Sequence, residues 1–253
     1  MNENYFKEEG KYRYIETNGG EDVLLLLHGL FGELSNFQGI IDEFKDIYNV
    51  VVPILPIFEI PFKELNLGSL VASVEEFTKY KGFNNYHVLG NSLGGHISIL
   101  YTLANPDKVR SIILTGSSGL FEDSLGNTFP PRGNYEFVKR KTESTFYDPS
   151  IATKEMVDEV YAVVNDRNKT LNIIATARSA IKNNLEDRLH DIKCPALLVW
   201  GKHDTITPPF VGEKFKELIP HADLHFIDKC GHAAMMEKPA VFNGILRKFL
   251  KMS

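Results

Sequence analysis

Three residue types that could together cleave an acyl bond stand at separate points of the chain. The first is a serine between glycines, in the segment Gly-Asn-Ser92-Leu-Gly-Gly, which directly follows the apolar run His87–Leu89. A serine hydroxyl becomes a nucleophile when a histidine removes its proton and an acid holds that histidine in one tautomer. Glycines two residues either side of the serine permit a strained strand-to-helix turn that presents the hydroxyl. This pattern predicts Ser92 as the nucleophile.

The partners of Ser92 are expected at the ends of later strands, with the acid before the histidine. Asp204 stands in the loop after the apolar run Ala196–Trp200, and His232 stands in the loop after Leu224–Ile227. Open parallel sheets bind their ligands beyond the carboxyl ends of their strands, which is where both loops lie. The prediction is that Asp204 orients and stabilises His232, and that His232 accepts the proton of Ser92.

Other residues near these loops could fill the same roles. The competing acids and histidines are Asp223, Asp228, His203, His221 and His225. Asp228 is too close in sequence to His232 to approach the ring from its far side. His203 fits a solvated loop residue, and the other two histidines lie beside or on the last strand, where a core or surface role is expected.

A fourth segment could stabilise the negative charge that develops on the substrate oxygen. It is His28-Gly-Leu30-Phe-Gly, directly after the apolar run Val23–Leu27. Such an oxyanion needs two N–H donors. We predict one from Leu93, the residue after the nucleophile, and the other from Leu30 in the glycine-containing loop. His28 itself is expected to brace this loop and to carry no proton.

The elements that must position these residues alternate between strand and helix. An antiparallel hairpin is expected from Phe6–Glu8 and Lys11–Thr17. Further strands are expected at Val23–Leu27, Val50–Leu55, His87–Leu89, Ile112–Leu114, Ala196–Trp200 and Leu224–Ile227. Helical spacing or end signals favour helices at Ser35–Phe44, Leu70–Tyr80, Leu93–Ala104, Pro209–Leu218 and Pro239–Leu250. Because the later strands are nearly continuously apolar, they are typical of a parallel sheet covered on both faces.

The alternation breaks between about Phe121 and Ile192. A loop rich in Gly and Pro at Gly126–Gly133 precedes helical segments near Tyr135–Phe146, Lys154–Val164 and Leu171–Lys182. An all-helical insert between two strands predicts a cap. We therefore expect a core domain of residues 1–120 and 191–253 and a helical cap, or lid, of residues 121–190. The core is predicted to be a doubly wound, mostly parallel sheet of about eight strands, with the cap inserted between strands 6 and 7.

Composition limits the classes of partner. The chain has 253 residues, with 28 Lys and Arg against 33 Asp and Glu, for a net charge of −5. This balance implies no basic surface, so neither nucleic acid nor an anionic membrane is an expected partner. No apolar run approaches the roughly 20 residues that a membrane-spanning helix needs, and the N-terminus has no apolar signal region. We expect a cytoplasmic protein, and the sequence does not define its oligomeric state.

Cysteines and histidines predict no covalent or metal framework. The two cysteines, Cys194 and Cys230, cannot build a disulfide scaffold. The eight histidines suggest no metal site, so no metal and no cofactor are expected.

The chain resembles the α/β-hydrolase superfamily along nearly its whole length. The resemblance rests on the His-Gly loop at His28, the elbow at Ser92, the Gly-Lys-His-Asp204 loop and the Cys-Gly-His232 loop. Several stretches are further similar to the meta-cleavage product hydrolases, which split carbon–carbon bonds. These stretches are Gly90–Gly95, Ser35–Phe37, Ile219–His225, and Cys230–His232 followed by Glu237–Pro239 and Phe242–Asn243.

The sequence departs from the pattern of that narrower family in three places. Ala233 stands where an aromatic residue usually follows the histidine, Thr205-Ile206 follows Asp204 where Arg and an aromatic are usual, and Pro53–Pro61 replaces a common Asp-x-x-Gly-x-Gly turn. The family's cap also carries an arginine for the substrate carboxylate. Arg167 and Arg178 are candidates for that role, and both also fit solvated helix positions.

The resemblance implies an enzyme that acts on a small molecule. The leading hypothesis is a serine hydrolase with a Ser-Asp-His triad, acting on a carboxylic ester or related acyl substrate. One alternative is a carbon–carbon bond hydrolase of a diketo acid. The other is a non-catalytic ligand-binding member of the fold.

Overall fold

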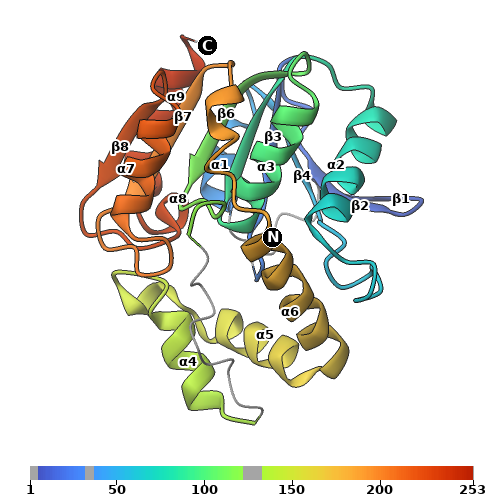
Figure 1. The fold of residues 1–253 in the computed structure, drawn as a ribbon, viewed down its shortest axis with the longest axis vertical. Coiled ribbons are helices and arrows are strands. Elements are labelled where there is room, and N and C mark those ends of the chain that lie inside the picture. The colour runs from blue at the N-terminus through green and yellow to red at the C-terminus, as the bar shows by residue number, and fades with distance from the viewer. Residues whose placement is uncertain (1–4, 32–36, 122–132, 253) are drawn as a thin grey trace.

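A single twisted sheet organises the protein. The computed structural model describes residues 5–31, 37–121 and 133–252 (Figure 1). Eight strands lie in the order β1-β2-β4-β3-β5-β6-β7-β8. Their bounds are β1 Phe6–Glu9, β2 Tyr12–Glu16, β3 Val23–Leu27, β4 Asn49–Pro53, β5 Tyr86–Asn91, β6 Val109–Thr115, β7 Ala196–Gly201 and β8 Asp223–Ile227. The pairs β1–β2 and β2–β4 are antiparallel and the other pairs are parallel. The predicted mostly parallel, eight-stranded sheet is confirmed.

Most predicted strand positions hold, and the differences are at their ends. β4 ends at Pro53 rather than at Leu55, and β5 continues to Asn91. The extra residues of β5 matter because Asn91 pairs with Thr115 at the end of β6. The strand therefore runs up to Ser92 without an intervening loop.

Helices cover both faces of the sheet, as continuous apolar strands require. They are α1 Gln38–Phe44, α2 Leu67–Lys81, α3 Leu93–Ala104, α7 Pro209–Leu218, α8 Ala234–Glu237 and α9 Pro239–Leu250. Leu24 and Leu26 of β3 pack in one core cluster with residues of α1, α8 and α9. Their neighbours Leu25 and Leu27 pack on the other face with residues of α2 and α3. Alternate side chains of one strand thus serve two cores, which makes the fold doubly wound.

Two helices begin earlier than predicted because of their caps. α2 starts at Leu67 instead of Leu70, since Asn66 and Ser69 form a reciprocal capping box. α6 starts at Arg167 instead of Leu171, since the Asp166 side chain accepts the first free N–H groups of the helix. The short helix α8 was not predicted. The predicted positions Ser35 and Asn36 lie outside the described residues.

The helices α4 Tyr135–Glu143, α5 Lys154–Asn165 and α6 Arg167–Lys182 follow β6 and precede β7, with two short 3-10 turns at Pro149–Ile151 and Leu189–Asp191. Figure 1 shows α4, α5 and α6 gathered below the sheet, in yellow-green, yellow and brown. The Asn172 amide of α6 donates to the carbonyls of Ile57 and Ile60, so this layer is attached to the loop after β4. The helical insert stands where the cap was expected. Its division from the core at residues 120 and 191 remains a prediction, and the loop at 126–132 lies outside the described residues.

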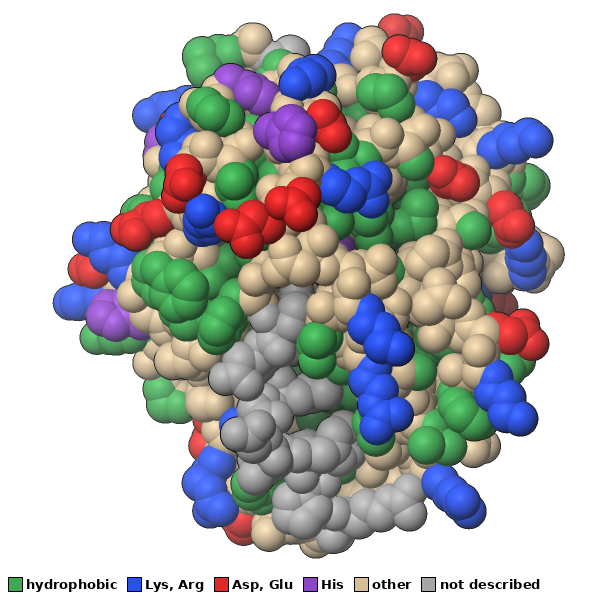
Figure 2. Space-filling model, in the orientation of Figure 1, with side chains coloured by type: hydrophobic (Ala, Val, Ile, Leu, Met, Phe, Trp, Pro, Cys, Tyr) green, Lys and Arg blue, Asp and Glu red, His purple; other side chains and the backbone are tan. Residues whose placement is uncertain are grey.

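Two general features bear on partners. Within the described residues, no helix combines the length and the apolar character needed to pass through a bilayer. On the face drawn in Figure 2, basic and acidic side chains are interspersed across the described surface. This face therefore carries a mixed charge pattern.

Candidate active site

The turn between β5 and α3 holds Ser92 in a strained backbone conformation. Its φ is 55° and its ψ is −120°, a region that non-glycine residues rarely occupy. A Cβ atom on Gly90 would lie 2.3 Å from the carbonyl oxygen of Gly94, and one on Gly94 would lie 1.9 Å from that of Leu27. Both positions therefore require glycine, which is the physical reason for the Gly-x-Ser-x-Gly spacing.

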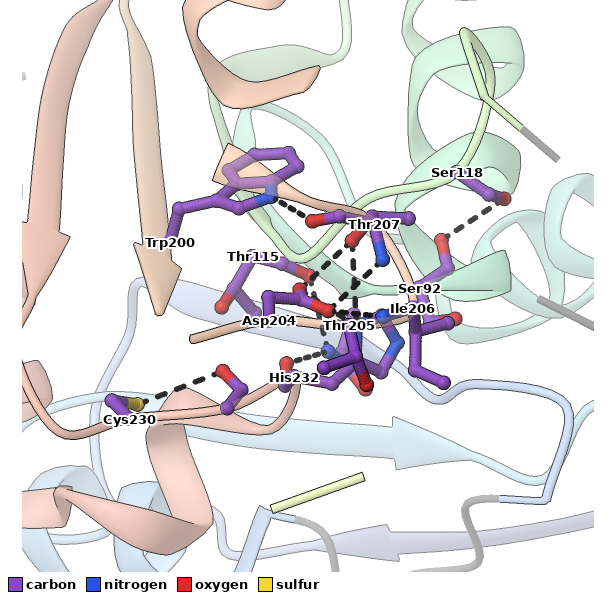
Figure 3. A network of polar contacts seen from close by, with 12 residues as sticks. Ser92, Thr115, Ser118, Trp200, Asp204, Thr205, Ile206, Thr207, Cys230 and His232 are labelled. Carbon is purple, nitrogen blue, oxygen red and sulfur yellow. Dashed lines mark hydrogen bonds and ion pairs between the residues drawn. The ribbon is translucent and has the colours of Figure 1, made fainter. Parts of the chain in front are cut away.

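Hydrogen bonds hold the Ser92 backbone against the end of β6. Its N–H donates to the Thr115 carbonyl at 3.2 Å. Its carbonyl accepts the N–H of Gly95 at 3.0 Å and that of Ser118 at 3.1 Å. Figure 3 shows a further contact from the Ser118 hydroxyl to the Ser92 carbonyl. The polar backbone groups of the strained turn are thus hydrogen-bonded.

The Asp204 side chain is almost fully enclosed and its carboxylate is surrounded by donors. Oδ1 accepts the N–H groups of Ile206 and Thr207 at 2.8 and 2.9 Å, and Oδ2 accepts the Thr207 hydroxyl at 2.9 Å. Trp200 in turn donates its indole N–H to the Thr207 carbonyl. These bonds, drawn in Figure 3, fix the orientation of the carboxylate.

Asp204 and His232 meet directly. Nδ1 of His232 lies 2.9 Å from Oδ2 of Asp204, and both side chains are buried. Burial by itself raises the pKa of the Asp204 carboxyl, but the nearby His232 and the N–H donors of Thr207 and Ile206 outweigh it, so that the pKa lies below its usual value. The ionised carboxylate can only accept, so Nδ1 of His232 carries the donated proton. Nε2 of a neutral ring is then left as the basic nitrogen.

Ser92 and His232 lie against the same end of β6. The side-chain amide of Asn91, next to Ser92, donates to the Thr115 carbonyl at 3.0 Å and reaches the His232 carbonyl at 3.5 Å. A Cβ on Gly116 would lie 2.9 Å from Nδ1 of His232. Among the hydrogen bonds of the described residues, none joins the Ser92 hydroxyl to the His232 ring. The structure therefore brings the two residues to one sheet edge without linking their side chains.

The loop that carries Leu30 also lies close to Ser92. A Cβ on Gly29 would lie 3.3 Å from the Cβ of Ser92, so the backbone here is in close contact with the serine. Leu93 is the first residue of α3, where backbone N–H groups have no partner within the helix. The two predicted oxyanion donors thus lie on elements that flank Ser92.

His28 braces this loop, as expected from the sequence. Its Nδ1 lies 2.8 Å from the Gly29 carbonyl, and its Nε2 accepts the Leu55 N–H at 3.0 Å. Burial lowers the pKa of its imidazole to about 4. With both ring nitrogens engaged, His28 acts as a neutral link between the ends of β3 and β4.

A cavity of about 60 Å³ opens beside this loop and reaches helix α5. Its described lining includes Leu30 and Phe31 from the loop, Leu55 and Phe58 from the segment after β4, and Val160 from α5. The surface is mainly apolar. Arg13 and Glu59, which form an ion pair with each other, also line it. A short apolar group is the kind of ligand that such a cavity suits.

The competing acids and histidines are engaged elsewhere. Asp228 lies within ion-pair distance of Lys202 and His203 at the surface. Asp223 is bound to His225 at 2.9 Å. His221 contacts the Cys194 carbonyl at 3.0 Å. Of the acid–histidine pairs that the structure brings together, Asp204–His232 is buried, whereas Asp223–His225 and Asp228–His203 are exposed.

The two candidate arginines and the cysteines lie apart from the described site. Arg167 and Arg178 are exposed on α6, and neither is among the described residues that line the cavity next to Leu30. Both cysteines are free thiols. Burial raises the pKa of Cys230 to about 12 and that of Cys194 to about 11, so each stays a protonated, unreactive thiol at neutral pH. Within the described part of the chain, no group of three or more His, Cys, Asp or Glu side chains is arranged to hold a metal ion.

Two residues of the site were missed at the level of sequence. Thr207 binds the Asp204 carboxylate through both its N–H and its hydroxyl. An aspartate side chain commonly accepts the backbone N–H of a residue two or three positions later, so the spacing of Asp204 and Thr207 is a sequence signal for this bond. Glu237, which accepts the N–H of Gly231 beside His232, carried no comparable local signal.

Comparison with known proteins matches this architecture to a family. Residues 22–239 match the family described as the alpha/beta hydrolase fold. The chain belongs to the α/β-hydrolase family. The protein is a hydrolase of this family, and the proteins similar to it include enzymes named as meta-cleavage product hydrolases and enzymes named as lipases.

A relative from Burkholderia vietnamiensis, a 2-hydroxy-6-oxononadienedioate/2-hydroxy-6-oxononatrienedioate hydrolase, is 28% identical over 269 residues, covering 96% of this chain and 92% of its own. Lipase 1 of Psychrobacter immobilis is 29% identical, covering 90% of this chain and 76% of its own. Among solved structures, the alpha/beta hydrolase MGS-MChE2, from the metagenome of sediments of the Mar Chica lagoon in Morocco, is 42% identical with a TM-score of 0.81 and covers 98% of both chains. The resemblance to meta-cleavage product hydrolases is thus found among relatives that also include lipases.

Proposed function

We propose that this α/β-hydrolase is a serine esterase for small acyl substrates, with Ser92, His232 and Asp204 as its catalytic triad. The observation that carries the proposal is the buried bond from Nδ1 of His232 to Oδ2 of Asp204 at 2.9 Å, at the sheet edge where Ser92 is held in a strained turn. That bond selects the tautomer in which Nε2 is a base.

The reaction follows from this arrangement in two steps. Nε2 of His232 accepts the Ser92 proton while Oγ bonds to the acyl carbon, and the alcohol then leaves with that proton. Water next gives its proton to His232 and attacks the acyl-serine, which releases the acid and restores Ser92. The Leu30 and Leu93 N–H groups would hold the oxyanion in both steps, and losing one such donor typically costs about 100- to 1000-fold in rate.

The cavity beside Leu30 supports a short acyl group. At about 60 Å³ it is smaller than the roughly 150 Å³ of an engineered cavity that admits benzene. Its lining is mainly apolar, and its one lining arginine, among the described residues, is paired with Glu59. An uncharged chain of a few carbon atoms therefore fits better than a free carboxylate.

The decisive test is Ser92→Ala, assayed with p-nitrophenyl acetate. We expect turnover to fall to background while the circular dichroism spectrum and the urea midpoint stay close to those of the wild type. We also expect a fluorophosphonate probe to label the wild type and not the variant. Retained turnover in Ser92→Ala, or no labelling of the folded wild type, would refute the assignment of the nucleophile.

A second candidate function is the hydrolysis of a carbon–carbon bond in a diketo acid. It is favoured by the names of relatives such as the Burkholderia vietnamiensis hydrolase, at 28% identity. The two candidates are separated by comparing kcat/KM for a series of p-nitrophenyl esters with that for a dienone acid, followed by loss of its absorbance. Faster cleavage of the dienone acid than of any ester would replace the esterase proposal.

A further inference from the structure

A buried carboxylate outside the proposed triad lies next to the histidine loop. Glu237 ends α8, five residues after His232, and the residue is 7% exposed. Oε2 accepts the N–H of Gly231 at 2.6 Å and that of Tyr147 at 3.2 Å, while Oε1 accepts the N–H of Asp148 at 2.7 Å. Among the described residues no lysine or arginine forms an ion pair with it. Backbone N–H groups are therefore its main compensation for burial.

The three N–H groups come from two segments that are far apart in the sequence. Gly231 belongs to the histidine loop, and the other two belong to residues 144–148, here called the strap, which follows α4. The strap also contacts His232 directly, because the Thr145 carbonyl accepts the His232 N–H at 2.8 Å. The strap and the histidine loop are thus joined twice, once by the direct bond from His232 to Thr145 and once through the Glu237 carboxylate.

The contact between the strap and the histidine loop is close along the backbone. A Cβ on Gly231 would lie 2.6 Å from the Thr145 carbonyl oxygen and 2.9 Å from Phe146 backbone atoms. The strap also reaches the aspartate loop, where the Thr205 hydroxyl donates to the Ser144 carbonyl at 3.0 Å. One segment therefore touches the loops of both Asp204 and His232.

We propose that Glu237 is a positioning residue, which fixes the backbone of the His232 loop against the strap so that the imidazole meets Asp204 and faces Ser92. This inference rests on the proposed function, since it assigns Glu237 a part in the same triad. The physical argument is geometric. The ring of His232 is held at Nδ1 and its backbone at N–H, so a shift of the neighbouring Gly231 moves Nε2. A displacement of about 1 Å in a catalytic group can cost about 100-fold in rate.

The test compares Glu237→Gln with Glu16→Gln. Glu16 is a matched control, because it is also a buried carboxylate, 4% exposed. It ends β2, near the opposite edge of the sheet, and it binds Lys7 of β1 and Lys81 of α2. In Glu237→Gln an NH2 group replaces one acceptor oxygen and meets a backbone donor. We expect its kcat for p-nitrophenyl acetate to fall about 10- to 100-fold with KM changed less than about threefold. Glu16→Gln is expected to keep both constants within about threefold, whatever stability it loses.

A second readout does not depend on turnover. The Nδ1 proton of His232, hydrogen-bonded to Asp204, should give a far-downfield proton resonance that Asp204→Asn abolishes. We expect this resonance to be lost or broadened in Glu237→Gln and kept in Glu16→Gln. If Glu237→Gln does not fold, Glu237→Asp keeps the charge on a shorter side chain, and should lower kcat about 3- to 10-fold with the same spectroscopic change.

The outcomes separate this inference from the proposed function. Unchanged kcat and an unchanged resonance in the Glu237 variants would overturn the positioning role, even if Ser92→Ala is inactive. A loss of kcat no larger than that of Glu16→Gln at equal stability, or a rise in KM alone, would overturn it as well. If Ser92→Ala retains turnover, the proposed function fails, and the resonance alone then decides whether Glu237 positions His232.

Discussion

The imidazole of His232 and the carboxylate of Asp204 form a buried pair whose Nδ1–Oδ2 distance is 2.9 Å. The two residues come from loops after adjacent strands, β8 and β7. Because those strands are parallel, their carboxyl ends lie at the same edge of the sheet. The pair thus follows from the sheet topology, and its chemistry can be tested one residue at a time.

Replacing Asp204 by Asn should remove most of the activity without unfolding the protein. The amide oxygen can still accept the Ile206 and Thr207 N–H groups, but the carboxylate that selects the tautomer of His232 is lost. We expect kcat for p-nitrophenyl acetate to fall about 10³- to 10⁴-fold. Asp228→Asn is the control, since that carboxylate is exposed, and it should change kcat less than about twofold. Equal losses in both variants would argue against Asp204.

The elbow should not tolerate a methyl group. In Gly94→Ala, the new Cβ would lie 1.9 Å from the Leu27 carbonyl oxygen, so the backbone must move. We expect the free energy of unfolding to fall by about 1–3 kcal/mol or more, measured by urea denaturation. Gly244→Ala, in α9 where no atom lies within 4 Å of the added Cβ, should instead gain about 0.5–1 kcal/mol. A Gly94→Ala protein as stable as the wild type would contradict the geometry.

Acyl-chain preference should depend on the wall that α5 contributes to the cavity. Val160→Ala removes part of that wall. We expect the ratio of kcat/KM for p-nitrophenyl hexanoate to that for the acetate to rise about tenfold. Val157→Ala, on the same helix but outside the described lining, should leave the ratio unchanged. The proposed location of the acyl group is wrong if the two variants behave alike.

Mild acid should destabilise the fold through three buried histidines. Burial lowers the pKa of His28, His87 and His96 from 6.5 to about 4. Between these pH values the unfolded chain binds more protons than the folded one. The contribution of the neutral histidines to the free energy of unfolding is therefore fully present above about pH 6.5 and is lost as the pH falls toward 4. Glu16 and Asp204, whose pKa values are lowered from 4.5 and 3.8, contribute only at more acidic pH.

Urea denaturation at about pH 7 and about pH 5 measures this loss. We expect about 1–2 kcal/mol per histidine at the lower pH. His87→Gln, which removes one of the three groups from a site beside Ser111, should reduce the difference between the two pH values by about a third. Equal stability of the wild type at both pH values would show that these rings are protonated in the folded protein.

The parts of the site that depend on local chemistry could be read from the sequence. The Gly90 and Gly94 spacing predicted a strained turn, and the φ of 55° at Ser92 has that character. The apolar runs predicted the strands and a mostly parallel sheet, but not the order of the strands in it. The helix starts at Leu67 and Arg167 were misplaced because the caps at Asn66 and Asp166 were not recognised, although these caps too are local.

Contacts between distant segments were beyond such reasoning. Periodicity and turn chemistry act over a few residues, so they determined that Asp204 and His232 follow strand ends, but not the 2.9 Å contact or the donors that surround it. The bonds from the 144–148 strap to Glu237 and His232 have no sequence pattern, because they arise when a helical insert folds back on the edge of the sheet. By itself the sequence determined which residues could do chemistry and on which elements they stand. Tertiary packing decided which of them meet, because backbone groups buried between layers must find partners wherever the chain brings them.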